Sequence, residues 1–308
     1  MKIDAFDRLV KLKRPKSCIR GLATLAMLAW SGAAITAQPF ADVHVHFNWD
    51  QREVIDAEQV AAKLQAANVE FAVAAGTPTE LALELARASG GRVIPLFSPY
   101  IHELGRSDWH LSPRVVAMAE AGLSAGDYHG IGEIHFMVGF RPRFDNGVFL
   151  QLMALAIEYR VPVLIHIDSS NEEAFLAICR TYPSLDILFA HAGGNLYPSH
   201  IRRIVETCPN AWIEFSARDP WRFGGLTGED GRLLPEWREL VIDYPDRFVT
   251  GTDPVWRVTR TQSWDLADDG WDYFEQLIAW HRAWLADLPA DLRRKISLEN
   301  ARRLFRRE

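Results

Sequence analysis

Eight short apolar runs, rich in β-branched and aromatic residues, alternate along this chain with stretches of helical periodicity. Most runs show little alternation of polar and apolar residues, which is typical of parallel strands buried on both faces. We predict strands at residues 40–46, 70–76, 93–100, 130–136, 162–168, 186–193, 211–217 and 248–254. Eight β-then-α units in about 270 residues predict an α/β fold of the (β/α)8 or TIM-barrel type.

Helix-start signals occupy the gaps between these runs. Asp56 followed by Gln59 resembles a capping box, and Asn146 and Asn171 can each cap an amphipathic stretch. Further helices are predicted at 234–247, at 271–287 and through 292–305. A doubly wound open sheet is the competing layout, but it would not bring all eight strand ends to one mouth. The first strand is also not followed by a Gly-rich phosphate-binding fingerprint, which favours the barrel.

Residues 1–37 have the order of a secretory signal. A basic stretch precedes an uncharged run from Gly21 to Ala37, and small residues lead into Gln38. We predict a signal peptide at 1–37, cleaved after Ala37, and a single barrel domain at 38–308 in a periplasmic or secreted protein. One alternative is an uncleaved membrane anchor, because the run is close to the roughly 17-residue minimum for spanning a bilayer. The other is a cytosolic protein with a misassigned start.

The charge of the chain bears on its partners. The net charge is −6 over 308 residues, from 34 Lys/Arg and 40 Asp/Glu. Residues 1–37 hold seven of the basic and two of the acidic groups, so the remainder carries 27 positive and 38 negative groups, a net charge of −11. Nucleic-acid binding requires a basic groove, and this acidic body does not provide one. We therefore expect a small-molecule substrate, and no membrane contact once the signal is removed.

Three cysteines are present, and cleavage of the signal would leave Cys179 and Cys208. Both lie near the ends of successive predicted helices. An exported compartment permits a disulfide between them. The sequence interpretation nevertheless favours two buried free thiols.

Residues of the types that bind metals stand at the ends of five predicted strands. In a parallel barrel the carboxyl ends of the strands converge on one mouth. Imidazole and carboxylate are the ligands that Zn²⁺, Mn²⁺ and Fe²⁺ prefer. Each residue alone has an ordinary explanation, such as a buried histidine bonded to a carbonyl, but six such residues in one mouth exceed what packing requires. The predicted metal ligands are His44, His46, Glu133, His166, His191 and Asp253.

Neighbouring residues have open roles. Asp42 lies two residues before His44 on the same strand face, where it either orients a histidine or bonds a backbone amide. His135, two residues beyond Glu133, is read first as bonded to water or backbone, with substrate contact and a metal bond as alternatives. The other histidines lie in predicted loops or helices and are expected mostly at the surface: His102, His110, His129, His200 and His281.

Taken together, these motifs resemble the amidohydrolase superfamily of metal-dependent hydrolases. The resemblance is to the amidohydrolase 2 branch, which includes aminocarboxymuconate-semialdehyde decarboxylase-like enzymes, and it covers residues 40–306. It rests on Asp42-x-His44-x-His46, on His166, on His191 with Gly193-Gly194, on Gly-Thr-Asp253, and on Asn300-Ala301-Arg302-Arg303-Leu304-Phe305.

The resemblance implies divalent-metal chemistry, with Zn²⁺ as the first choice and Mn²⁺ or Fe²⁺ as alternatives. Glu133 departs from the mononuclear decarboxylase-like pattern and stands where binuclear relatives place a bridging carboxylated lysine or glutamate. We favour two ions over one, with Glu133 bridging an ion on the two first-strand histidines and Asp253 to another on His166 and His191. Asp253 would take the proton of the attacking water. With one ion, His191 would act as a base or stabilise the oxyanion.

Side chains just beyond the strand ends suggest the substrate. Arginine suits a carboxylate, and tryptophan suits an aromatic or flat aliphatic surface. These side chains indicate an acidic or aromatic small molecule, although ordinary loop ion pairs and packing explain each of them at least as well. The resemblance implies hydrolysis of an amide, ester, lactone or related bond. A metal-dependent non-oxidative decarboxylase of an aromatic or unsaturated carboxylic acid is the alternative enzyme, and a non-catalytic metal-binding protein is the alternative class. The candidate substrate residues are His135, Arg141, Arg143, Trp221, Arg222, Trp256 and Arg257.

Overall fold

The computed structural model describes residues 38–136, 143–167, 171–256 and 267–307. The folded unit spans Ala37–Glu308. The predictions for residues 1–37 and for Arg141 and Arg257 lie outside the described residues. Within the described part of the chain, no helix combines the length and the apolar character needed to cross a bilayer.

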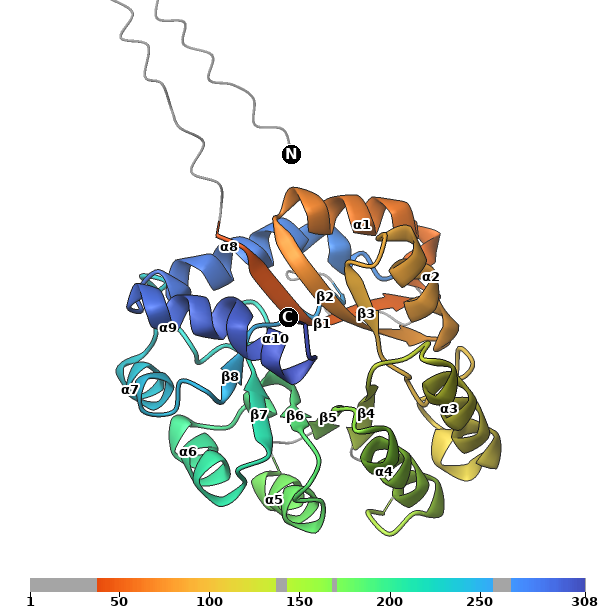
Figure 1. Cartoon of the computed structure of the whole chain (residues 1–308). Helices are drawn as coiled ribbons and strands as arrows, with labels where there is room; N and C mark the ends of the chain where they lie inside the picture. Colours follow the sequence, from red (N-terminus) through yellow and green to blue (C-terminus); the bar gives the residue numbers. More distant parts are fainter. Residues whose placement is uncertain (1–37, 137–142, 168–170, 257–266, 308) are drawn as a thin grey trace, which may run out of the picture. The chain divides into compact units, whose positions relative to one another are not determined.

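All eight predicted strands form, and every paired strand is parallel to its neighbour (Figure 1). They run in the order β1-β2-β3 and β4-β5-β6-β7-β8. Their bounds are β1 Phe40–Asn48, β2 Val69–Thr77, β3 Val93–Pro95, β4 Ile131–Phe136, β5 Val163–Ile167, β6 Ile187–Phe189, β7 Ala211–Glu214 and β8 Phe248–Val249.

Backbone contacts join these two sets of strands at both edges. Phe97, just beyond β3, forms a parallel bridge with Ile131 of β4. On the other side, the Val43 amide of β1 donates to the carbonyl of Thr250, which directly follows β8, at 2.9 Å. Each strand therefore has a neighbour on both sides, and the (β/α)8 barrel is confirmed.

Strands β3, β6, β7 and β8 end earlier than predicted, and the turns after β6 and β8 carry predicted ligands. His191 lies in a short turn at Ala190–Gly193 with φ 58°, and Asp253 lies beyond β8 with φ 49°. A positive φ turns the chain away from extended geometry, so the ladder stops before each of these residues. Both side chains are therefore presented on turns at the mouth rather than on strands.

Helices cover the outside of the barrel, one or more after each strand (Figure 1). The predicted caps are confirmed: Asp56 and Gln59 form a capping box, Asn146 accepts from two backbone amides of its helix, and Asn171 accepts from one. Each such cap is worth about 1 kcal/mol. The bounds are α1 Ala57–Ala66, α2 Glu80–Ala88, α3 Pro113–Ala125, α4 Gly147–Tyr159, α5 Glu172–Thr181, α6 Pro198–Thr207, α7 Pro235–Asp243, α8 Phe274–Leu285, α9 Ala290–Arg294 and α10 Asn300–Leu304.

The two ends of the barrel differ in polarity. At the amino-terminal end, apolar residues from early positions in the strands form a cluster with Leu298, Ala301 and Leu304 of the C-terminal segment. Helix α10 lies across this end of the ring (Figure 1). The opposite end holds the buried histidines and carboxylates. Among the described residues, apolar side chains therefore fill the amino-terminal end of the barrel, and the polar site lies toward the carboxyl ends of the strands.

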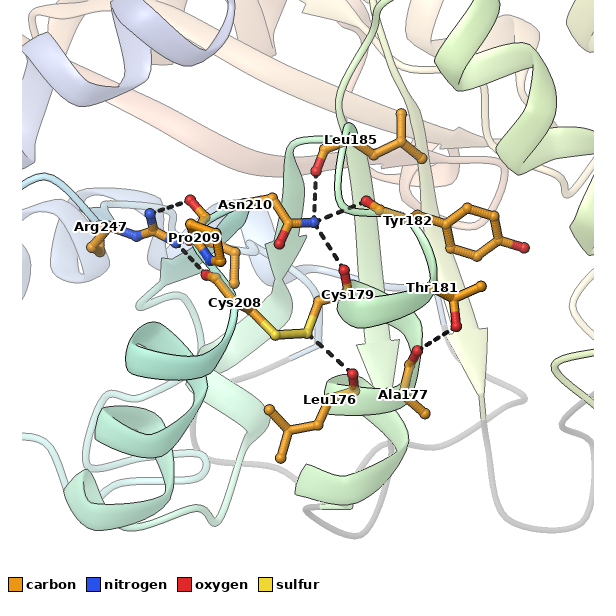
Figure 2. The surroundings of a disulfide bond; sticks show 11 residues. Leu176, Ala177, Cys179, Thr181, Tyr182, Leu185, Cys208, Pro209, Asn210 and Arg247 are labelled. Atoms are coloured by element: carbon orange, nitrogen blue, oxygen red, sulfur yellow. Dashed lines mark hydrogen bonds between the residues drawn. A yellow bond between two sulfur atoms is a disulfide. The ribbon is translucent and has the colours of Figure 1, made fainter.

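Cys179 and Cys208 form a disulfide, so the expectation of two free thiols was wrong (Figure 2). Cys179 lies in the last turn of α5, and Cys208 directly follows α6. The Asn210 side-chain amide donates to the carbonyls of Cys179, Tyr182 and Leu185, which holds the start of β7 against the end of α5. This contact between segments distant in sequence brings the Cα atoms of the two cysteines to 6.0 Å.

His281 is also a correction, because it is completely buried rather than at the surface. It occupies the inner face of α8 with Leu277 and Leu285, four residues away in each direction. Its Nδ1 accepts a hydrogen bond from Trp284 Nε1 at 3.2 Å. The other four histidines expected at the surface, His102, His110, His129 and His200, are exposed or half-buried.

Candidate metal centre

The carboxylate of Glu133, on β4, lies between two pairs of histidines. Its Oε1 is 2.9 Å from His166 Nδ1 and 3.4 Å from His191 Nε2. Its Oε2 is 3.2 Å from His46 Nε2 and 3.5 Å from His44 Nε2. One carboxylate thus joins side chains from β1, β5 and the turn after β6, as convergence at the mouth predicted.

Asp253 completes the side of the centre that β1 provides. Its Oδ1 lies 3.4 Å from His46 Nε2 and 3.9 Å from His44 Nε2. The Asp253 amide donates to the His44 carbonyl at 2.7 Å, which fixes the turn after β8 against β1. All six predicted ligands are therefore brought together in one cluster.

The donor set fits a divalent cation. The Nε2 atoms of His44 and His46 are 3.0 Å apart and converge with Asp253 Oδ1. Nitrogen and oxygen donors at this spacing suit Zn²⁺, Mn²⁺ or Fe²⁺. Three groups of donors have their ligand atoms within 4.8 Å of one another. They are His44 with His46 and Asp253, His44 with Glu133 and His191, and Glu133 with His135 and His166.

The histidines and carboxylates of the cluster shift one another's pKa values. Burial alone would raise the pKa of Glu133, but the nearby His135 and His44 and hydrogen bonds from two further histidines hold it well below its usual value. Burial likewise opposes protonation of His44, yet Glu133, Glu214 and Asp253 together raise its pKa well above the usual value. The negative potential of these carboxylates favours a cation at this place.

Glu214 and Ser216 were missed by the sequence analysis, although both contact the predicted ligands. Glu214 is fully buried at the end of β7, and its Oε1 lies 2.9 Å from His44 Nδ1. Ser216 Oγ lies 2.7 Å from His191 Nδ1. A charged residue within the apolar run AWIEF was the available signal, because a buried carboxylate needs a partner.

Asp42 takes the backbone role rather than the histidine-orienting one. Its Oδ1 accepts from the amide of Thr252 at 2.9 Å and from the amide of His44 at 3.3 Å. Its Oδ2 accepts from the Thr252 hydroxyl at 2.6 Å. Burial raises the pKa of Asp42 to about 7, and these hydrogen bonds oppose the rise. Asp42 therefore ties β1 to the segment that follows β8.

His135 is buried and belongs to the cluster. Its Nε2 lies 3.2 Å from Glu133 Oε2, and its Nδ1 lies 2.7 Å from the hydroxyl of Tyr100. The His135 amide donates to the same hydroxyl at 2.9 Å. Tyr100, another residue that the sequence did not single out, is in turn covered by the guanidinium of Arg106, 5.8 Å from its ring centre.

The other predicted substrate residues are placed differently. Arg143 is exposed and pairs with Asp145 at 2.8 Å. The side chain of Arg222 is buried. Its guanidinium pairs with Asp219 and donates to the backbone carbonyls of Thr252 and Asp253. Trp221 is partly exposed and Trp256 half-buried. Within the described residues, Arg143, Trp221 and Trp256 make no hydrogen bond or ion pair with the six predicted ligands.

Residues 41–307 match the family model described as amidohydrolase. The sequence has no match among curated proteins.

Three solved structures illustrate the similarity of fold. A probable 2-pyrone-4,6-dicarboxylic acid hydrolase from Acinetobacter baumannii, with citric acid bound, is 15% identical over 86% of this chain and 98% of that chain, with a TM-score of 0.55. An amidohydrolase from Burkholderia multivorans with bound zinc is 17% identical over 87% and 99%, with a TM-score of 0.54. A 2,6-dihydroxybenzoate decarboxylase complexed with 2,6-dihydroxybenzoate is 14% identical over 87% and 99%, with a TM-score of 0.54. These likenesses show a shared fold, and because the family model covers most of the sequence, the chain belongs to the amidohydrolase family of enzymes.

Proposed function

We propose that this enzyme hydrolyses an amide, ester, lactone or related bond of a small molecule with two divalent metal ions. The observation that carries the proposal is the position of Glu133, whose two oxygens face different groups of ligands. Oε2 faces the two β1 histidines, and Oε1 faces His166 and His191. Asp253 lies beside the β1 histidines. A carboxylate that points one oxygen to each side suits a bridge between two ions. Zn²⁺ is the first choice because imidazole nitrogens dominate the donor set.

A divalent ion would lower the pKa of water toward about 7 and polarise the scissile group. The protein residues then handle protons and orientation. Asp253 Oδ1 is placed to accept the proton of water and to return it to the leaving group. Arg222 Nη1 lies 3.6 Å from the other carboxylate oxygen of Asp253 and holds the side chain in place. In a site with a single ion, His191 would act as the base or stabilise the oxyanion.

We further propose that the substrate carries a carboxylate. Arg106 lies over the Tyr100 ring and is close enough to His135 to lower its pKa, although burial is the larger cause of that lowering. Among the described residues, no carboxylate pairs with Arg106. A guanidinium beside the centre that lacks a partner suits an acidic ligand. The hydrolase with bound citric acid and the decarboxylase complexed with a benzoate, both similar in fold, support an acidic substrate.

Metal analysis of wild type and of His166→Ala tests the proposed centre. We expect about two zinc ions per wild-type chain and no more than one in the variant, because His166 Nδ1 faces Glu133 Oε1. His129→Ala, at an exposed histidine, is the matched control. Full metal content in His166→Ala would remove His166 from the set of ligands.

A substrate panel separates hydrolysis from decarboxylation. Acidic esters, lactones, amides and phosphoesters should be tested beside aromatic and unsaturated carboxylic acids, with carbon dioxide measured directly. We expect hydrolysis and no carbon dioxide. Release of carbon dioxide by a protein that contains one ion would favour the decarboxylase and contradict this proposal.

We also propose that residues 1–37 are removed during export. The disulfide between Cys179 and Cys208 supports export, since disulfides persist in oxidising compartments. The mass of the protein purified from the periplasm or medium tests this, with Gln38 expected as the first residue. Recovery of the full-length chain from the cytosol alone would contradict it.

A further inference from the structure

Glu214 contacts both sides of the metal centre. Its Oε1 lies 2.9 Å from Nδ1 of His44, one of the β1 histidines, and accepts the backbone amide of His191 at 2.6 Å. The carboxylate is completely buried, so its hydrogen-bond partners must come from the protein. Ser216 supplies another, because its hydroxyl lies 2.8 Å from the same oxygen.

The directions of these hydrogen bonds follow from the chemistry of the groups. An ionised carboxylate only accepts hydrogen bonds, so the Ser216 hydroxyl and His44 Nδ1–H both donate to Glu214. Because its own hydrogen is directed to Glu214, Ser216 Oγ accepts a hydrogen bond from His191 Nδ1 at 2.7 Å. Both rings thus carry a proton on Nδ1. A proton held on Nδ1 leaves Nε2, which faces Glu133 at 3.5 Å in His44 and 3.4 Å in His191, as the nitrogen with which each ring can bind a cation.

The contacts of His135 place its ring proton on the other nitrogen. The hydroxyl of Tyr100 accepts from the His135 amide, and His135 Nδ1 is the one acceptor that the described residues offer to its own hydrogen, so the hydroxyl donates a hydrogen bond to that nitrogen. In the neutral ring the remaining proton lies on Nε2, which faces Glu133 Oε2 at 3.2 Å. His135 is therefore a hydrogen-bond donor to Glu133, although its distances alone would allow it to be counted as a ligand.

We infer that Glu214 and Ser216 are positioning residues that select the metal-binding tautomer of His44 and His191, whereas Tyr100 excludes His135 from the ligands. The inference rests on the proposed metal centre and deepens it. A ligand histidine commonly donates its other ring nitrogen to a carboxylate or similar acceptor, and losing that acceptor typically weakens metal binding 10- to 100-fold. Here the buried Glu214 carboxylate bonds the ring of His44 on one side of Glu133 and the backbone amide of His191 on the other.

The tautomers can be measured directly. Long-range proton–nitrogen correlation spectra of the metal-free protein labelled with ¹⁵N-histidine distinguish Nδ1–H from Nε2–H rings, and single histidine variants assign the signals. We expect Nδ1 to carry a proton in His44 and His191, whether or not Nε2 is also protonated without metal, and Nδ1 to lack a proton in His135. The reverse pattern at His44 and His191 would overturn the inference whether or not metal binds.

Metal affinity provides the second test, through zinc competition with a chelator and the visible spectrum of the Co²⁺-loaded protein. Glu214→Gln should weaken zinc binding about 10- to 100-fold and alter the cobalt spectrum. Ser216→Ala should weaken chiefly the ion bound by His191, and it carries the test if Glu214→Gln does not fold. The matched controls are Glu172→Gln, at a buried carboxylate that pairs with Arg203, and Ser297→Ala, at a buried serine whose hydroxyl has no hydrogen-bond partner among the described residues.

The outcomes separate this inference from the proposed function. If wild type binds zinc and both variants keep its affinity and its cobalt spectrum, Glu214 and Ser216 do not position the ligands, and the inference fails alone. If wild type itself binds no zinc, the proposed metal-dependent function fails, and the inference fails with it. Weaker binding in the two variants, with both controls unchanged, supports the inference.

Discussion

Arg222 fixes Asp253 from behind. One end of the guanidinium donates to the Asp253 carbonyl and lies 3.6 Å from the Asp253 carboxylate, while the other end pairs with Asp219. The side chain of Arg222 is only 4% exposed. These contacts suit a residue that orients Asp253, whereas the position of Arg222 in the sequence had suggested contact with the substrate.

Replacing Arg222 should separate catalysis from folding. Arg222→Lys keeps the charge but not the planar fork, so we expect a stable protein with kcat lowered about 100-fold, the usual effect of a displacement near 1 Å. Arg222→Met would leave Asp219 buried and unpaired and should cost about 3–5 kcal/mol of unfolding free energy. Urea unfolding and steady-state kinetics check both variants. Unchanged kcat in Arg222→Lys would show that Asp253 keeps its orientation without the planar guanidinium of Arg222.

Loss of the Glu133 charge should reduce the metal content. Glu133→Gln preserves the size of the side chain but replaces one carboxylate oxygen with an amide nitrogen that cannot bind a cation. We expect zinc to fall from about two ions per chain to about one, measured by elemental analysis. Glu173→Gln, at an exposed side chain, is the control. Two ions retained in Glu133→Gln would argue against a bridging carboxylate.

Buried His281 should make the fold sensitive to acid. Burial lowers the pKa of His281 to about 3, below its usual value of about 6.5. As the pH falls through 6.5, the unfolded chain binds a proton that the folded protein does not. The unfolding free energy should therefore fall between pH 6.5 and 3 by up to about 1.4 kcal/mol per pH unit from this residue.

His281→Asn provides the comparison for that effect. The asparagine oxygen can accept the hydrogen bond that Trp284 Nε1 gives to His281. We expect a shallower pH dependence of unfolding free energy in the variant, measured by urea unfolding at a series of pH values. Parallel curves for the two proteins would show that His281 takes up its proton equally in both states.

The disulfide should contribute substantially to stability. Cys179 and Cys208 are 29 residues apart, and closing a loop of this length stabilises a fold by about 3.6 kcal/mol. The Cys179→Ser, Cys208→Ser double variant should lose roughly this amount in urea unfolding. A reducing agent should destabilise wild type and leave the double variant unchanged. Equal stability of oxidised and reduced wild type would contradict the expectation.

Much of the site was predicted from residues that are close together in the sequence. The two-residue spacing of His44 and His46 places both rings on one face of a strand, and the structure brings their Nε2 atoms to 3.0 Å. The capping box of Asp56 and Gln59 was equally readable, because its hydrogen bonds join residues three apart. Such features depend on neighbours in sequence, so the sequence contains what is needed to predict them.

Contacts between distant segments could not be predicted in this way. Ser216 and Tyr100 are ordinary residues in sequence, and their contacts with the histidines exist only because separate strands and loops meet. Arg222 resembled a substrate residue because its loop follows β7, whereas the fold turns its side chain behind Asp253. Asn210, through its contacts with α5, likewise brought together two cysteines that were expected to be free.

The eight strands, the helix starts and the residues with metal-binding donors were readable from the amino-acid sequence, since apolar runs, helical periodicity and capping are local properties of the chain. Tertiary structure decided which oxygen of Glu133 faces which histidines. It also decided which ring nitrogen of each histidine is presented to the centre. The physical reason is that the second ring nitrogen of His44 is bonded by Glu214 and that of His191 by Ser216, residues distant in the sequence, and only closure of the barrel brings these pairs together.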